Sequence, residues 1–147
     1  MRRWVMVIGV VALAMGASAV RAGDANKFQF WSPSEMKFKS PQQGIERAVA
    51  WGDPDKGAFG MIVKFAAGAD RGWHSHSHPV HLVVISGTLV FEGEGAAPQE
   101  LGPGDGVTEP AKVKHVSRCK EGADCTFLIT GTQKYDFIAA KPATARK

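Results

Sequence analysis

The sequence predicts an all-β protein, and three observations carry this prediction. The chain has 147 residues, which is a usual length for one domain. Its 17 glycines and 8 prolines suit short strands that are joined by tight turns. Strand-like apolar runs recur about every eight to twelve residues, and no stretch after residue 23 has a convincing helical period. We therefore expect a β sandwich or barrel, and not a fold of alternating strands and helices.

The individual strands can be assigned from their apolar patterns. In residues 58–66 the side chains alternate, because Phe59 and Met61 fall on one face and Ile62 and Lys64 on the other. Further strands are expected at residues 81–91, with a turn or bulge at 86–87, at 113–117 and at 126–130. Glycine-rich turns are expected at 93–95 and 102–106, and a helical turn at most at 34–39.

The N-terminus has the pattern of a secretory signal peptide. Two arginines precede an apolar run over residues 4–15, and small residues follow it. A run of about a dozen apolar residues is too short to span a bilayer comfortably. We expect residues 1–22 to be a signal peptide, cleaved after Ala19 or Ala22, and the mature protein to be periplasmic or secreted. An uncleaved membrane anchor is the alternative.

The net charge of +4 is concentrated at the two ends of the chain. The leader holds three of the 18 basic residues, and three more lie in residues 141–147, a basic C-terminal tail without apolar periodicity. The domain between them, residues 23–140, therefore has 12 basic and 14 acidic residues. Because it has no basic patch for phosphate binding, we expect no nucleic-acid partner. No second apolar stretch is long enough to cross a bilayer, so we expect no membrane partner once the leader is removed.

The two cysteines, Cys119 and Cys125, lie close together in the sequence. In an oxidising compartment such a pair is expected to form a disulfide. Residues 120–124 between them have a turn composition, so the bond would clip a β-hairpin. A redox-active pair, a metal-binding pair and free thiols are the alternatives.

The histidines carry the strongest functional signal, because four of the five lie within eight residues. His74 and His76 point to the same face of an extended segment, since side chains alternate along a strand. Two imidazoles on one face can chelate one metal ion, and His115 can supply a third ligand from a different strand. A solvated, polar histidine-rich loop is the alternative interpretation.

Two longer motifs surround these histidines. The first, G-x5-H-x-H followed by a glycine, matches at Gly68, His74, His76 and Gly87. The second, G-x5-P-x-G-x2-H, matches at Gly104, Pro110 and His115, with Lys112 where the pattern often has glycine. Over residues 45–138 the chain resembles the cupin superfamily, and the paired motifs at the correct spacing make that resemblance specific.

The resemblance implies a single-domain jelly-roll β-barrel over residues 23–140. It places the two motifs on neighbouring strands inside the barrel, where His74, His76 and His115 hold one metal near the mouth. The ion would be one divalent transition metal, and imidazole ligands suit Fe, Mn, Zn, Cu and Ni alike. The resemblance also allows a homodimer.

The chain departs from the family pattern at one ligand. The glutamate that cupins place in the first motif falls on Val80, which cannot bind a metal. His81 follows it and is the candidate fourth ligand, although regular strand pairing would turn it away from the other histidines. His78 is a further candidate, and both can instead be surface histidines. We expect Glu109 to be a solvated turn carboxylate.

These residues predict an exported metal-binding protein. Three neutral imidazoles leave a divalent metal its full charge, which favours a small anionic substrate and strengthens the acidity of bound water. We expect a mononuclear metal enzyme, dioxygenase-like or other, whose catalytic residues the sequence does not assign. A non-catalytic metal- or ligand-binding module of the periplasm is the alternative, and a purely structural or dimerising barrel is a third hypothesis.

Overall fold

The computed structural model of the chain describes residues 27–141. The chain divides into two units, Met1–Phe30 and Trp31–Lys147, and every described strand belongs to the second. The expected leader over residues 1–22, its cleavage sites and residues 142–147 of the expected tail lie outside the described residues, so these assignments stay predictions. Among the described residues, no helix has the length and apolar character to cross a membrane.

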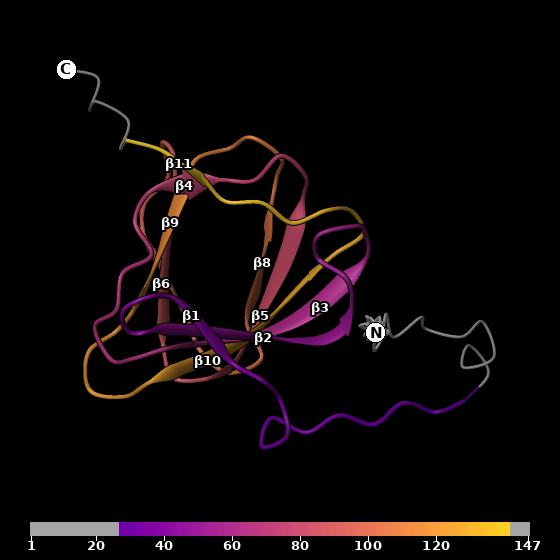
Figure 1. The fold of residues 1–147 in the computed structure, drawn as a ribbon. Helices are drawn as coiled ribbons and strands as arrows, with labels where there is room; N and C mark the ends of the chain where they lie inside the picture. Colours follow the sequence, from indigo (N-terminus) through magenta and orange to yellow (C-terminus); the bar gives the residue numbers. More distant parts are fainter. Residues whose placement is uncertain (1–26, 142–147) are drawn as a thin grey trace, which may run out of the picture. The chain divides into compact units, whose positions relative to one another are not determined.

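Eleven strands form two sheets, and all neighbouring strands run antiparallel (Figure 1). The six-stranded sheet has the order β1 (Lys39–Gln42), β2 (Ile45–Gly52), β3 (Phe59–Phe65), β10 (Cys125–Gly131), β5 (Val80–Ser86), β8 (Gly106–Glu109). The five-stranded sheet has the order β11 (Ile138–Ala139), β4 (His74–Ser75), β9 (His115–Cys119), β6 (Leu89–Gly93), β7 (Gln99–Leu101). The all-β jelly-roll prediction is therefore confirmed, although these two sheets do not close into a barrel.

The hydrophobic core lies between the sheets. It draws apolar side chains from β3, β5 and β10 of one sheet and from β6 and β9 of the other. The expected inner face of β3 is confirmed, because Phe59 and Met61 lie in this core. The outer face of β3 is covered too, since a Cβ atom on Gly60 would lie only 2.2 Å from the Trp51 ring. Strand β3 is therefore buried on both sides, which anchors the six-stranded sheet at its centre.

The expected turn at residues 86–87 is confirmed, and it divides the long apolar run into β5 and β6. Gly87 has a φ of 77°, and a Cβ atom there would lie 2.4 Å from the carbonyl oxygen of Asp124. Only glycine fits both the left-handed backbone and this close approach. The turn passes the chain from one sheet to the other, as a jelly roll requires.

The disulfide between Cys119 and Cys125 is confirmed, but the expected hairpin is wrong. Cys119 ends β9 and Cys125 begins β10, and these strands belong to different sheets. The bond therefore ties the two sheets together at one edge of the core. Because it closes a short loop, it is expected to stabilise the fold by only about 2 kcal/mol.

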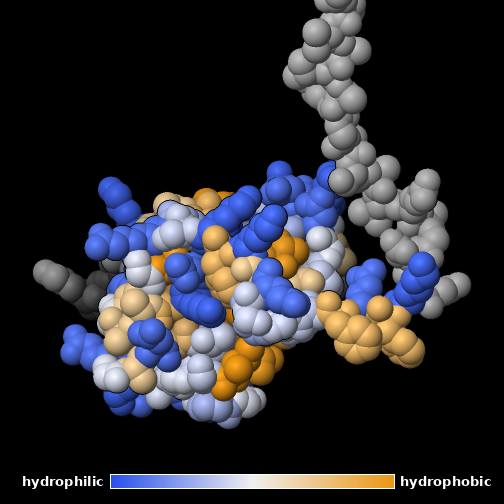
Figure 2. Space-filling view, turned by 60° about the horizontal axis from the view of Figure 1, so that its bottom comes forward, coloured by the Kyte–Doolittle hydropathy of each residue, from blue (hydrophilic) through white to orange (hydrophobic). Residues whose placement is uncertain are grey.

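Several apolar side chains remain exposed on the outer face of the six-stranded sheet. Val83 and Ile85 point outward from β5, whose inward positions are buried, and Trp51 is exposed on β2, where it pairs with Gly60. On the face turned forward in Figure 2, apolar patches are interspersed with hydrophilic side chains. The expected homodimer is untested and stays a prediction.

Candidate metal centre

Three histidines converge at the end of the five-stranded sheet. His74 on β4 pairs in register with His115 on β9, so that their rings lie 4.3 Å apart. The His76 ring follows just beyond β4, at 5.1 Å from His74 and 5.2 Å from His115. The possible ligand nitrogens of the three residues all lie within 4.8 Å of one another. The structure thus brings together three of the four expected metal ligands.

Each of the three imidazoles is held by a backbone carbonyl at its Nδ1 atom. His74 Nδ1 lies 2.8 Å from the oxygen of Gly72, His76 Nδ1 2.5 Å from that of Asp136, and His115 Nδ1 3.0 Å from that of Val113. A carbonyl oxygen only accepts hydrogen bonds, so each Nδ1 carries the proton and donates it. In the neutral rings, Nε2 is then left with a free lone pair, which is the form that binds a metal.

Lys112 supports this arrangement from the second motif. It occupies the position where the family often has glycine, and its φ of 65° is the left-handed conformation that glycine adopts most readily. Its amide donates a 2.7 Å hydrogen bond to the His76 carbonyl oxygen. The departure from glycine therefore leaves the backbone shape of the motif intact, at a conformational cost of about 1 kcal/mol.

Burial favours the neutral form of His74 and His115. His74 is only 4% exposed, and His76 and His115 are each 2% exposed. Burial lowers the pKa of His74 to about 3, because a charged imidazolium would lose its hydration there. Burial also lowers the pKa of His115. Neutral imidazole, and not imidazolium, is the ligand that a metal ion needs.

Glu109 is the functional residue that sequence reasoning missed. Its carboxylate is 4% exposed, and its Oε2 atom lies 3.2 Å from His76 Nε2 and 3.4 Å from His115 Nε2. The expectation of a solvated turn carboxylate is therefore wrong. The sequence signal that could have found it is the alternation of side chains along β8, which puts Glu109 on the same face as the partly buried Val107.

The position of Glu109 also explains the missing family glutamate. Val80 on β5 pairs in register with Glu109 on β8, and both side chains are buried. Residues directly opposite in an antiparallel pair project from the same face of the sheet. The Glu109 carboxylate thus projects from the same face as position 80, where the family pattern has its glutamate.

One buried acceptor of the cluster has no donor. His115 Nε2 is buried and has no hydrogen-bond partner. Glu109 Oε2 lies 3.4 Å from it, but a carboxylate oxygen is also an acceptor. Buried lone pairs without a donor are unfavourable, because each has lost its hydrogen bond to water. A divalent cation would satisfy all of these atoms at once, so the residues fit a metal ion.

His81 is not brought to this cluster. It lies on the exposed face of β5, between the buried Val80 and Leu82, and its Nδ1 is 3.1 Å from Thr108 Oγ1. His78 is half-buried and also lies outside the group of three. Their roles as ligands remain untested, and the geometry favours the three buried histidines.

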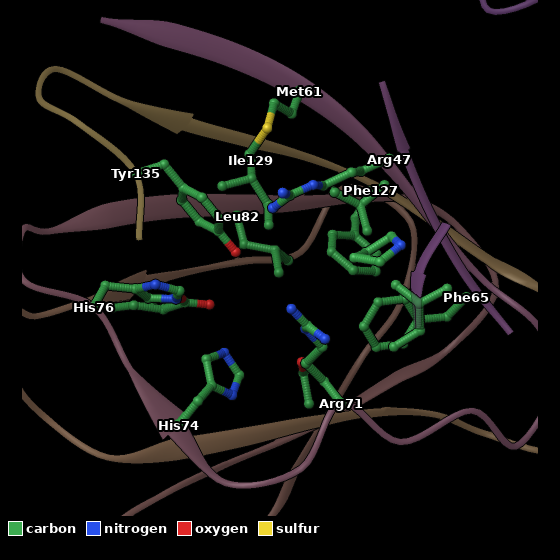
Figure 3. Close-up of a pocket in the computed structure, with 15 residues that line it drawn as sticks. Arg47, Met61, Phe65, Arg71, His74, His76, Leu82, Phe127, Ile129 and Tyr135 are labelled. Atoms are coloured by element: carbon green, nitrogen blue, oxygen red, sulfur yellow. The ribbon is translucent and has the colours of Figure 1, made fainter. Parts of the chain in front are cut away.

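A small cavity of about 30 Å³ opens beside His74 and His76 (Figure 3). Most of its wall is apolar. The polar side chains that line it are Arg47, Arg71, His74, His76, Glu109, Ser117 and Tyr135. The candidate metal centre therefore borders a space in which a second molecule can bind.

We expect the metal-free protein to lose stability as the pH falls from about 6.5 toward 5. The pKa of His74 is about 3 in the folded protein, against 6.5 for an ordinary histidine. Between these values the unfolded chain binds a proton that the folded protein does not, so the free energy of unfolding falls by about 1.4 kcal/mol per pH unit. Urea unfolding of EDTA-treated protein at several pH values measures this slope. A stability that stays constant over this range would contradict the prediction.

Comparison with known proteins agrees with the fold and the two motifs. The family model described as "Cupin domain" matches residues 61–131. KdgF from Halomonas sp. is 24% identical, with a TM-score of 0.62 over 74% of this chain and 96% of that chain. The polyketide cyclase RemF from Streptomyces resistomycificus is 14% identical, with a TM-score of 0.69 over 80% of this chain and 88% of that chain. The DMSP lyase DddQ from Ruegeria pomeroyi is 20% identical, with a TM-score of 0.63 over 76% of this chain and 64% of that chain. At these identities the likeness to solved structures shows the fold alone, and no curated protein matches the chain.

Proposed function

Because this chain belongs to the cupin superfamily, we propose that it binds one divalent transition metal and acts with it on a small anionic molecule outside the cytosol. One observation carries the proposal: ligand nitrogens of His74, His76 and His115 converge in a buried cluster, and the Nδ1 atom of each ring is tied to a carbonyl. The Glu109 carboxylate beside two of them is the proposed fourth ligand.

The proposed ligand set changes the charge of the site. Three neutral imidazoles alone would leave the metal at +2, whereas the carboxylate of Glu109 lowers the combined charge to +1. A preference for anions then rests on other groups in the cavity, and Arg47 and Arg71 supply that charge. When bound, the metal supplies a Lewis acid that polarises an oxygen ligand and acidifies bound water.

Tyr135 supports an enzyme over a passive metal carrier. Its ring lies 5.0 Å from the His76 ring and lines the same cavity (Figure 3). Burial raises the pKa of its phenol to about 12, so the hydroxyl keeps its proton at neutral pH. Tyr135 can therefore donate a hydrogen bond to an oxygen of a bound molecule.

Export is supported by the disulfide between Cys119 and Cys125. Such bonds form and persist mainly in oxidising compartments, and they are rare in the cytosol. The leader pattern over residues 1–22 points the same way. Periplasmic or secreted localisation is part of the proposal, and a fractionation experiment with the full chain tests it.

A metal titration of the stripped protein tests the proposed function. Fe²⁺, Mn²⁺, Zn²⁺, Cu²⁺ and Ni²⁺ are added separately, and the stoichiometry and the melting temperature are measured. We expect one ion per chain and, at about a hundredfold excess over the dissociation constant, a stabilisation of about 2.7 kcal/mol. If none of these ions binds or raises the melting temperature, the proposal fails. Tight metal binding without turnover of small acids or thiols would instead support a non-catalytic metal-binding module.

A further inference from the structure

Two arginines face the same cavity and have no carboxylate partner. Arg47 and Arg71 both line the cavity beside His74 and His76 (Figure 3). Among the ion pairs that the structure describes within residues 27–141, neither guanidinium takes part. A guanidinium that is partly removed from water is normally neutralised by an anion, so the lack of one beside this pair requires an explanation.

The direction of Arg47 follows from its strand. On β2 it pairs in register with Val63 of β3, which is a core residue. Ile45, two residues earlier on the same face, is in the core as well. Arg47 therefore points inward among apolar side chains, and its guanidinium lies 5.7 Å from the centre of the Tyr135 ring. Position 47 is thus an inner-face position occupied by a cation.

Arg71 is held in place from three sides. Its amide donates a 3.0 Å hydrogen bond to the carbonyl of Ser117, and its Nη1 donates one of 2.9 Å to Gln42 Oε1. Its guanidinium stacks 3.9 Å from the centre of the Phe137 ring. Because these contacts fix the side chain, little rotamer entropy remains to be lost when a ligand binds.

Within residues 27–141, no acidic side chain forms an ion pair with either arginine. Arg118, by contrast, lies 2.8 Å from Asp70 and 3.4 Å from Glu92. The one carboxylate that lines the cavity belongs to Glu109, and it contacts two histidines instead. Burial lowers the pKa of Arg71, and the charge of Arg47 lowers it further, so the two cations act on each other.

We propose that Arg47 and Arg71 form a binding site for the carboxylate of a small organic acid. Guanidinium groups bind a planar carboxylate through paired hydrogen bonds, and the apolar wall of the cavity strengthens that attraction. The cavity is small, about 30 Å³, which favours a small acid. The rest of the acid then faces His74 and His76. That this acid is the substrate rests on the proposed function, whereas its binding to the arginines does not.

Calorimetric titration of the metal-free and the metal-loaded protein tests this site. The probes are malonate, acetate and inorganic phosphate, with uncharged acetamide as the control. The variants are Arg47→Gln and Arg71→Gln, and Arg118→Gln is the matched control because that arginine already has carboxylate partners. Melting curves establish that each variant is folded. Arg47→Lys and Arg71→Lys keep the charge but lose the guanidinium fork.

We expect malonate or acetate to bind the wild-type protein in both forms, and acetamide not to bind. Each Arg→Gln change should weaken this binding about tenfold to a hundredfold, with a smaller loss for each Arg→Lys change, while Arg118→Gln leaves it unchanged. Equal binding by wild type and the two Arg→Gln variants overturns the proposal, as does a wild-type protein that binds neither acid or prefers phosphate. If the protein binds carboxylates but takes up no metal, the arginine site stands and the proposed function is refuted.

Discussion

Replacing His115 by alanine is expected to abolish metal retention. His115 Nε2 is buried and has no hydrogen-bond partner. His115 also belongs to the group of three histidines whose possible ligand atoms lie within 4.8 Å of one another. Four-ligand zinc sites bind with about 10–16 kcal/mol in total, so the loss of one ligand should weaken binding at least about a hundredfold. Metal content after dialysis and a competition titration with a chromogenic chelator measure the change. The same result is expected for His76→Ala.

His81→Ala is the matched control for that experiment. It removes an imidazole of the same chemistry from the same segment, but the side chain is exposed and contacts Thr108 on the outer face. We expect its metal affinity to equal that of the wild type. If His81→Ala lost the metal while His115→Ala kept it, the assignment of the three buried histidines would be wrong.

Replacing Glu109 by glutamine is expected to have two opposite effects. It removes the negative charge beside the proposed ligands, so metal affinity should fall about tenfold to a hundredfold. The new amide group can instead donate a hydrogen bond to the lone pair on His76 Nε2, which lies 3.2 Å from Glu109 Oε2. The metal-free protein should therefore become more stable, by about 1 kcal/mol.

Glu100→Gln is the control for this charge removal. Glu100 is an exposed carboxylate that pairs with Lys120 at 2.8 Å, and it takes no part in the cavity. The Glu100→Gln change should alter neither the free energy of metal binding nor the stability of the metal-free protein by more than about 0.5 kcal/mol. Unchanged metal affinity in Glu109→Gln would remove Glu109 from the ligand set and leave a site of three histidines.

The parts of the fold that sequence analysis predicted are those with local signals. Period two in residues 58–66 predicts β3, and Gly87 marks the turn between β5 and β6. The spacing of the two motifs places His74, His76 and His115 together, because each motif belongs to one short segment. Strands β1, β2, β7 and β8 have weaker local signals, since at least half of the side chains in each are exposed.

The sequence by itself determined an all-β chain, the disulfide pairing and three histidines that converge. Only the tertiary structure decided what surrounds them. Glu109 reaches the site because β8 pairs with β5 in a register that puts it opposite Val80, and the same pairing leaves His81 outside. Arg47 and Arg71 meet because β2 and the loop before β4 border one cavity. Such neighbours depend on strand register and sheet packing between distant segments, and no local pattern encodes them.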